Sequence, residues 1–128
     1  MNRNLDQIRA ADAIAHCDDE FKGVDGGGIV KKIPPMIRDN GFLGALAFAV
    51  EQKGNSGNLK NPGHHHVFEC ILEHLKTLRR VPEGCGDPRA LMKYLCEEAD
   101  SAKLRDVTTE SLLYMNYLRR FVKSGKDD

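Results

Sequence analysis

Residues 29–50 read IVKKIPPMIRDNGFLGALAFAV, and the second half of this stretch decides the fold. From Phe42 to Val50 every side chain is apolar or absent, so a helix here presents no polar face. A helix that is apolar all round belongs in the interior of a domain, with neighbours on several sides. At about nine residues the segment is far shorter than the ~20 needed to cross a bilayer. We therefore predict a central buried helix over about residues 42–52.

The residues in front of this helix predict a turn. Asn40-Gly41 is typical of a helix end, because glycine and then asparagine tolerate the left-handed conformation found there. One helix should therefore end near Asp39 and the buried helix should begin directly afterwards. Pro34-Pro35 inside the first of them predicts a kink or a restart, since proline lacks the backbone donor. Lys31, Lys32 and Arg38 are then held on a rigid element beside the core.

Helical patterns continue through the rest of the chain. Apolar residues recur at helical spacing, and no segment alternates with the period of a strand. Thr108 has the position of a helix cap, with Val107 and Leu112 spaced to pack across it. We predict an all-α fold, a compact bundle of about six helices, with helices over residues 3–21, 29–39, 42–52, 64–80, 87–99 and 108–123.

Length and composition fit one domain. The chain has 128 residues, 41% hydrophobic and 30% charged, which is typical of a globular protein. We predict a single helical domain over residues 1–128, with flexible loops at about 22–28 and 53–63 and a frayed tail at 124–128. The polar start carries no secretory signal and the four cysteines have no paired spacing, so we expect a cytoplasmic protein with reduced thiols.

The formal charge is zero but its distribution is uneven. Residues 1–21 carry two basic and five acidic groups, net −3, whereas residues 29–80 carry eight basic and four acidic, net +4. Cations held on a rigid surface are what a phosphate backbone requires, and such contacts carry no sequence specificity. The basic residues at helix C-terminal ends, Arg79, Arg80 and Lys123, are also explained by the helix dipole. Lys31 and Lys32 lie near a helix start, where the dipole disfavours cations.

Patterns typical of catalytic and metal sites are weak. The chain has no Gly-x-Ser-x-Gly, His-Glu-x-x-His or P-loop motif. His66, Cys70 and His74 share one helical face, and imidazole and thiolate are good zinc ligands. Their i to i+8 span is roughly 12 Å, so a site would need two of them and a distant partner that the sequence does not identify. We expect no enzyme activity, no cofactor and no metal, and keep a metalloenzyme as an open alternative.

Residues 30–43, VKKIPPMIRDNGFL, followed by Ala45-Leu46-Ala47-Phe48, resemble the signature of the small helical subunit of the type III-B CRISPR (Cmr) effector complex. An early helix with Arg9 and Ala13 is also similar, and so is a closing segment with Thr108, Glu110 and Leu118-Arg119-Arg120-Phe121. The resemblance covers nearly the whole chain. Phe42 is a departure, because the family more often has leucine directly after the glycine.

The resemblance implies a non-catalytic, RNA-binding subunit of a ribonucleoprotein in antiviral defence. Several copies would stack along the groove that holds guide RNA and target RNA, touching the large subunit, the backbone subunits and neighbouring copies of themselves, with no membrane contact. The residues carried over as RNA-backbone contacts are Lys31, Lys32 and Arg38, then Arg9, Arg119 and Arg120. The alternative is a helical protein–protein adaptor with no direct nucleic-acid contact.

Overall fold

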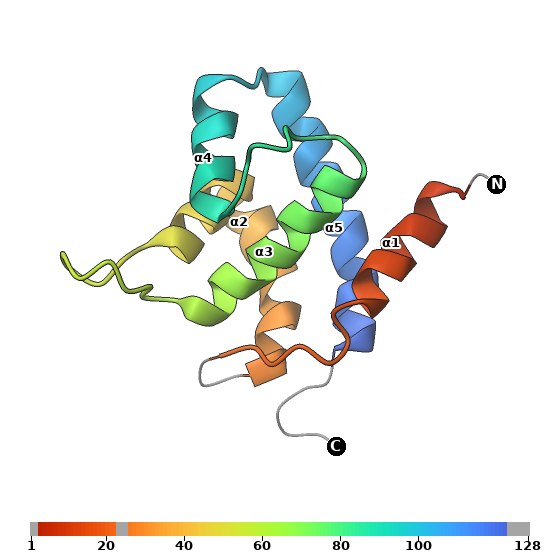
Figure 1. Ribbon diagram of the computed structural model, residues 1–128, viewed down its shortest axis with the longest axis horizontal. Helices are drawn as coiled ribbons and strands as arrows, with labels where there is room; N and C mark the ends of the chain where they lie inside the picture. The colour runs from red at the N-terminus through yellow and green to blue at the C-terminus, as the bar shows by residue number, and fades with distance from the viewer. Residues whose placement is uncertain (1–2, 23–25, 123–128) are drawn as a thin grey trace.

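The computed structural model describes residues 3–22 and 26–122, and within them every regular element is helical. The predicted all-α class and compact bundle are confirmed, with five α-helices in place of about six (Figure 1). A short 3₁₀ turn, η1 (Gly26–Gly28), precedes the second helix. The α-helices are α1 (Leu5–Ile14), α2 (Ile29–Val50), α3 (Pro62–Thr77), α4 (Pro88–Glu97) and α5 (Ser101–Phe121).

Helix α2 joins two segments that the sequence predicted as separate helices. Its backbone is helical except at Gly41, where φ is 81° and ψ is 161°. That conformation is essentially restricted to glycine, so the predicted turn is present as a sharp break inside one element. The helix does not restart at Pro34-Pro35, because both residues keep helical dihedrals and the break in α2 lies at Gly41.

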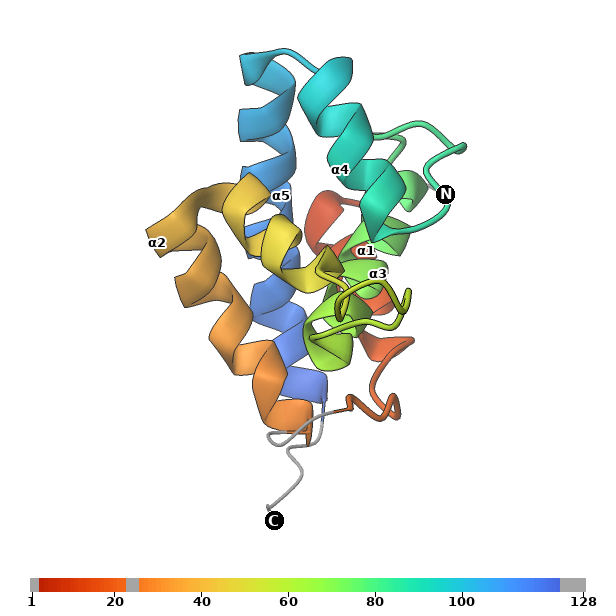
Figure 2. The same ribbon diagram turned by 90° about the vertical axis from the view of Figure 1, so that its left-hand side faces the viewer.

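Three helices surround α2, which packs against α3, α4 and α5 (Figure 2). Ala45, Leu46 and Ala49 on its second half are fully buried. The same half is not enclosed on all sides, because Gly44 is exposed and Phe48 remains 38% exposed. The central helix therefore has one outward face that the apolar sequence did not predict.

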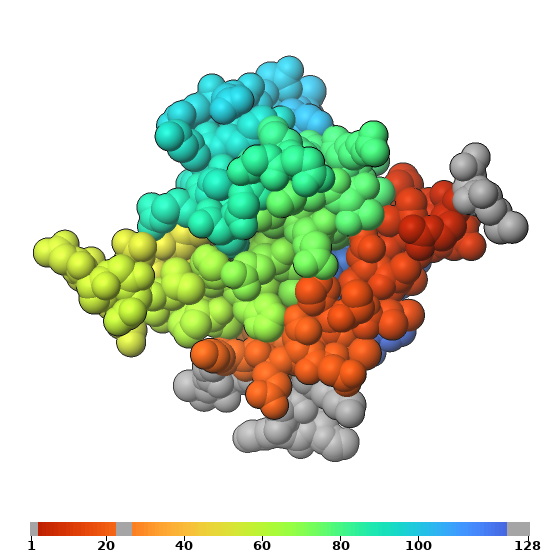
Figure 3. Space-filling view, viewed as in Figure 1, coloured from red at the N-terminus to blue at the C-terminus, as the bar shows by residue number. Residues whose placement is uncertain are grey.

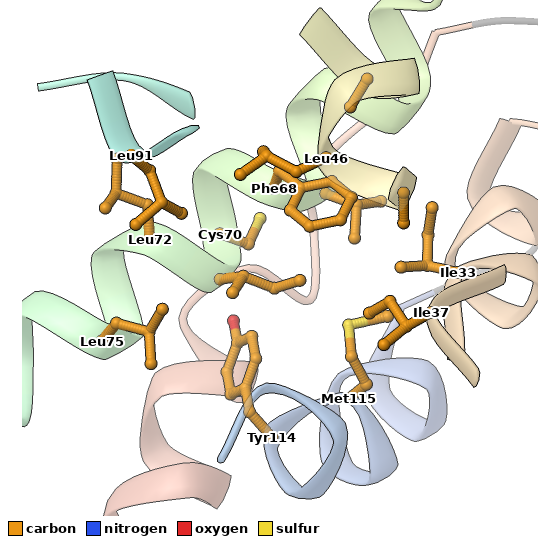
Figure 4. Close-up of a cluster of buried hydrophobic side chains, with 14 of the residues drawn as sticks. Ile33, Ile37, Leu46, Phe68, Cys70, Leu72, Leu75, Leu91, Tyr114 and Met115 are labelled. Carbon is orange, nitrogen blue, oxygen red and sulfur yellow. The ribbon is translucent and has the colours of Figure 1, made fainter. Parts of the chain in front are cut away.

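The core forms where α3 crosses α2 and α5. Figure 4 shows Phe68 of α3 beside Leu46 of α2, with Tyr114 and Met115 of α5 closing the cluster from the other side. Phe42 meets the Phe68 ring edge-on, with ring centroids 5.5 Å apart. Burying a large apolar side chain contributes about 1.5–3 kcal/mol, so these contacts hold the bundle together.

Two helix ends differ from the sequence prediction by seven residues, and the others by three or fewer. Helix α1 ends at Ile14 instead of residue 21, so the acidic run Asp18-Asp19-Glu20 lies beyond it. Helix α5 begins at Ser101, where the Asp100 side chain accepts a hydrogen bond from the Lys103 backbone N–H at 2.8 Å. Thr108 is inside α5, and its hydroxyl donates to the carbonyl of Leu104 at 2.7 Å. The predicted Thr108 cap was therefore wrong.

Part of each predicted loop is helical, because η1 covers Gly26–Gly28 and α3 begins at Pro62. Residues 51–60 fold back on themselves, with backbone hydrogen bonds from Lys53 to Asn58 and from Lys60 to Glu51 at 2.8 and 2.9 Å. Part of the predicted 22–28 loop and the tail at 124–128 lie outside the described residues. In the described ranges, no helix combines the length and the apolar content that a membrane crossing requires.

Candidate nucleic-acid interface

Lys31 and Arg38 lie on one exposed stripe of α2. Ile33 and Ile37 turn inward, so the side chains at positions 31, 35 and 38 point outward at helical spacing. Seven residues of helix place the two cations about 10 Å apart along the axis. Within residues 3–22 and 26–122, neither Lys31 nor Arg38 has a carboxylate partner. Lys32 is also exposed, about 100° around the helix from Lys31.

Arg119 and Arg120 occupy the last turn of α5. Both are exposed, and Arg120 Nε donates to the backbone carbonyl of Asn116 at 3.1 Å. They line a hollow of about 390 Å³ together with Asp6, Leu113, Asn116 and Tyr117. Figures 1 and 2 show that α5 ends at the same end of the molecule where α2 begins. The structure therefore brings the turns that carry Lys31, Lys32, Arg119 and Arg120 to one end of the bundle.

Arg9 is placed in a different environment. It is only 8% exposed, and its guanidinium holds both oxygens of Glu110 on α5, at 2.7 and 2.8 Å. A third hydrogen bond reaches Asp6 at 2.9 Å. The hydrogen bonds to Glu110 raise the pKa of Arg9 above its ordinary value. Because its donors are committed inside the molecule, we do not include Arg9 in the proposed RNA surface.

A buried polar network extends from this pair. His74 of α3 lies with Nε2 2.8 Å from Glu110 Oε2 and Nδ1 2.6 Å from Asp12 Oδ2. Its ring stacks on Tyr114, with centroids 4.4 Å apart and planes 11° from parallel. Arg9, Asp12, His74 and Glu110 thus join α1, α3 and α5. Sequence reasoning missed this network, because Arg9 and Glu110 are 101 positions apart and neither has a local signal.

The electrostatics of Glu110 fit a structural ion pair. Burial alone would raise the pKa of this carboxyl, but hydrogen bonds from Arg9 and His74 and their charges outweigh it and lower the pKa. Glu110 is therefore held as a carboxylate between Arg9 and His74. Buried charges of this kind are strongly coupled, and removing one partner leaves the others without compensation.

The structure separates the three potential ligands of α3. His74 joins the network just described, whereas His66 and Cys70 face the connection that follows α1. Asp19 lies there, with one oxygen 2.7 Å from His16 Nδ1 and 2.8 Å from His66 Nε2. Burial would raise the pKa of Asp19, but the hydrogen bonds from His16 and His66 lower it. His16 and Asp19 are thus the residues of this connection that lie beside His66 and Cys70.

Comparison with known proteins places the chain in a family. A family model described as CRISPR-associated protein (Cas_Cmr5) matches residues 5–125. The chain belongs to this family. The resemblance to the small Cmr subunit stated from the sequence is thereby confirmed.

Searches of curated proteins and of solved structures gave no match. The Cas_Cmr5 match spans every residue predicted to contact RNA, from Arg9 to Arg120. Membership makes the chain a CRISPR-associated Cmr subunit. The family match does not assign roles to individual side chains.

Proposed function

We propose that this Cas_Cmr5 chain is a non-catalytic small subunit of a type III-B CRISPR ribonucleoprotein in the cytoplasm. Several copies stack along the groove that holds guide and target RNA, in contact with the large subunit and the backbone subunits. Lys31, Lys32 and Arg38 contact the RNA backbone, and Arg119 and Arg120 extend the same surface.

The observation that carries the proposal is the exposed stripe of α2. Lys31 and Arg38 stand outward on a helix whose opposite face, with Ile33 and Ile37, is anchored in the core. Cations fixed on a rigid element lose little freedom on binding, which favours phosphate contacts. Such contacts are independent of base sequence, as a subunit serving changing guide sequences requires.

The groups with shifted pKa values support a structural role for the buried ionisable residues, and not a catalytic one. Arg9 and Glu110 are paired with each other in the core, and Glu110 also contacts His74. Burial raises the pKa of Cys85, which disfavours the thiolate needed of a nucleophile. These groups hold helices together, and the exposed cations lie elsewhere.

The test is RNA binding by the reconstituted complex that contains Lys31→Ala/Arg38→Glu. The matched control is Lys93→Ala/Arg105→Glu, which makes the same charge change at two exposed residues. They lie on α4 and early α5, at the opposite end of the bundle from the start of α2 (Figure 1). We expect weaker RNA retention for the α2 variant alone. Its salt dependence should also be shallower, because each phosphate contact adds about 0.7 to the slope of log affinity against log salt for single strands.

Exposed apolar side chains favour the alternative of a protein–protein adaptor. Among the described residues, Leu5, Ile14, Phe48, Leu113 and Phe121 are each at least 37% exposed. Side chains of this kind can be buried against a protein partner, as an adaptor requires. If Lys31→Ala/Lys32→Ala/Arg38→Glu assembles normally and RNA retention is unchanged, the adaptor without RNA contact is the correct function.

A further inference from the structure

Four side chains able to bind a metal meet beside α3, away from the cationic stripe. His16 and Asp19 come from the connection after α1, and His66 and Cys70 come from successive turns of α3. His16, Asp19 and Cys70 each offer one atom, and these atoms lie within 4.8 Å of one another. Cys70 Sγ lies 3.8 Å from the Asp19 oxygen that both imidazoles approach.

The connection is folded and packed against α3 by further contacts, in addition to those among the four side chains. Backbone hydrogen bonds of 3.0 Å from Cys17 to Ile14 and from Asp19 to His16 fold it into tight turns. The Phe21 ring packs on His66, with centroids 4.2 Å apart. A side chain at Gly63 would collide with the carbonyl oxygen of Lys22, so the chain passes very close to the start of α3. Figure 3 shows this connection lying directly against α3.

We propose that His16 Nδ1, Asp19 Oδ2, His66 Nε2 and Cys70 Sγ form a structural zinc site. Two imidazole nitrogens, a carboxylate and a thiolate are a donor set that Zn²⁺ accepts in tetrahedral geometry. With bonds of about 2.0–2.3 Å, neighbouring ligand atoms stand roughly 3.3–3.6 Å apart. The separations of 2.7, 2.8 and 3.8 Å around Asp19 therefore need adjustments of less than about 1 Å. His66 lies outside the group of atoms within 4.8 Å of one another, so its ring needs a larger movement toward His16 and Cys70.

The surroundings of His16 match those of a zinc ligand. While Nδ1 faces Asp19, Nε2 lies 3.1 Å from Glu73 Oε1. Metal-binding histidines commonly donate their second ring N–H to a carboxylate, which fixes the tautomer and orients the ring. The cluster also borders a hollow of about 480 Å³ lined by His16, His66, Cys70 and Glu73, among others, which gives an ion access.

Charge also balances in the loaded site. The Asp19 carboxylate and the Cys70 thiolate together neutralise Zn²⁺, so the partly buried cluster carries no net charge. On binding, the thiol proton and any extra imidazole proton pass to water, and no group is oxidised or reduced. The ion would clamp the connection after α1 onto α3. This proposal replaces the expectation of no metal, and it is independent of the proposed RNA surface.

The test uses the full chain without an affinity tag, stripped with a chelator and then titrated with Zn²⁺ in competition with a chromophoric chelator. We expect one ion per chain. Co²⁺ in place of Zn²⁺ should give tetrahedral visible bands and a thiolate charge-transfer band. Cys70→Ser should lose the charge-transfer band, and Asp19→Asn, at a partly exposed position, should weaken binding without loss of helix content. Glu73→Gln should weaken binding roughly 10- to 100-fold.

Matched controls separate this site from adventitious binding. Cys17→Ser and Cys96→Ser remove other free thiols, and both should keep the stoichiometry and the cobalt spectrum. His64→Ala/His65→Ala shortens the histidine run and should also keep them. Absence of stoichiometric binding would overturn the proposal. So would a spectrum that survives Cys70→Ser, or binding lost only when His64 and His65 are replaced.

Discussion

His74 and Glu110 meet in the interior of the protein, with Nε2 of one 2.8 Å from Oε2 of the other and both side chains at most 3% exposed. The same oxygen accepts from Arg9 Nε at 2.8 Å. The second ring nitrogen of His74 faces Asp12 at 2.6 Å. Helices α1, α3 and α5 are therefore joined by one network that runs from Asp12 through His74 and Glu110 to Arg9.

Replacing Glu110 with glutamine should destabilise the fold by about 3–5 kcal/mol, because Arg9 and His74 then lack their shared anion. Urea unfolding should show a lower midpoint with an unchanged slope. Glu97→Gln, at an exposed position of α4, is the matched control and should change stability by less than about 0.5 kcal/mol. Equal effects of the two substitutions would mean that the buried pair contributes little.

Acid should weaken the same network. The hydrogen bonds and charges of Arg9 and His74 outweigh burial and hold the pKa of Glu110 below its ordinary value. An unfolded glutamate has a pKa of about 4.3, so the folded chain binds this proton less readily. The stabilisation is then present above about pH 4.3 and lost as the pH falls through the folded-state pKa. Urea midpoints measured from pH 7 downward should fall less steeply for Glu110→Gln, and parallel curves would contradict this assignment.

Gly41→Ala should cost about 1–3 kcal/mol through backbone strain alone. The space around a Cβ at position 41 is open, with no atom within 4 Å, but φ of 81° with ψ of 161° disfavours every L side chain. Gly84→Ala is the control, since its Cβ also meets nothing and its φ is not positive. Thermal unfolding of both variants compares them directly. If the two lose similar stability, the cost does not come from the backbone conformation.

The sequence predicted the helical class and most of the buried stripes because these follow from local periodicity. The Asn40-Gly41 turn was also predictable, since few residues other than glycine adopt the φ of Gly41. The end of α1 could not be predicted, because residues 15–21 contain no glycine or proline to mark it. Because α1 ends at Ile14, Asp19 lies in the connection that follows and reaches two histidines.

Contacts between distant segments explain what sequence reasoning missed at the sites. The face shared by His66 and Cys70 was readable from their spacing, but their partners His16 and Asp19 lie about 50 positions away. Likewise, Arg9 was carried over from the family resemblance as an RNA contact, and nothing near it in the chain indicates Glu110. The outward position of cations such as Lys31 and Arg38 was easier to predict, because their neighbours along α2 define the exposed stripe.

The start of α5 at Ser101, capped by Asp100, can be tested by substitution. Asp100 accepts from the Lys103 backbone N–H at 2.8 Å, so Asp100→Ala should destabilise the chain by about 0.5–2 kcal/mol. Thr108 is mid-helix, where alanine is the better helix former, so Thr108→Ala should cost less than Asp100→Ala. Amide exchange should show residues 104–107 protected in the wild type and less so in Asp100→Ala. A larger loss for Thr108→Ala, with residues 101–107 exchanging freely, would place the start of the helix at Thr108.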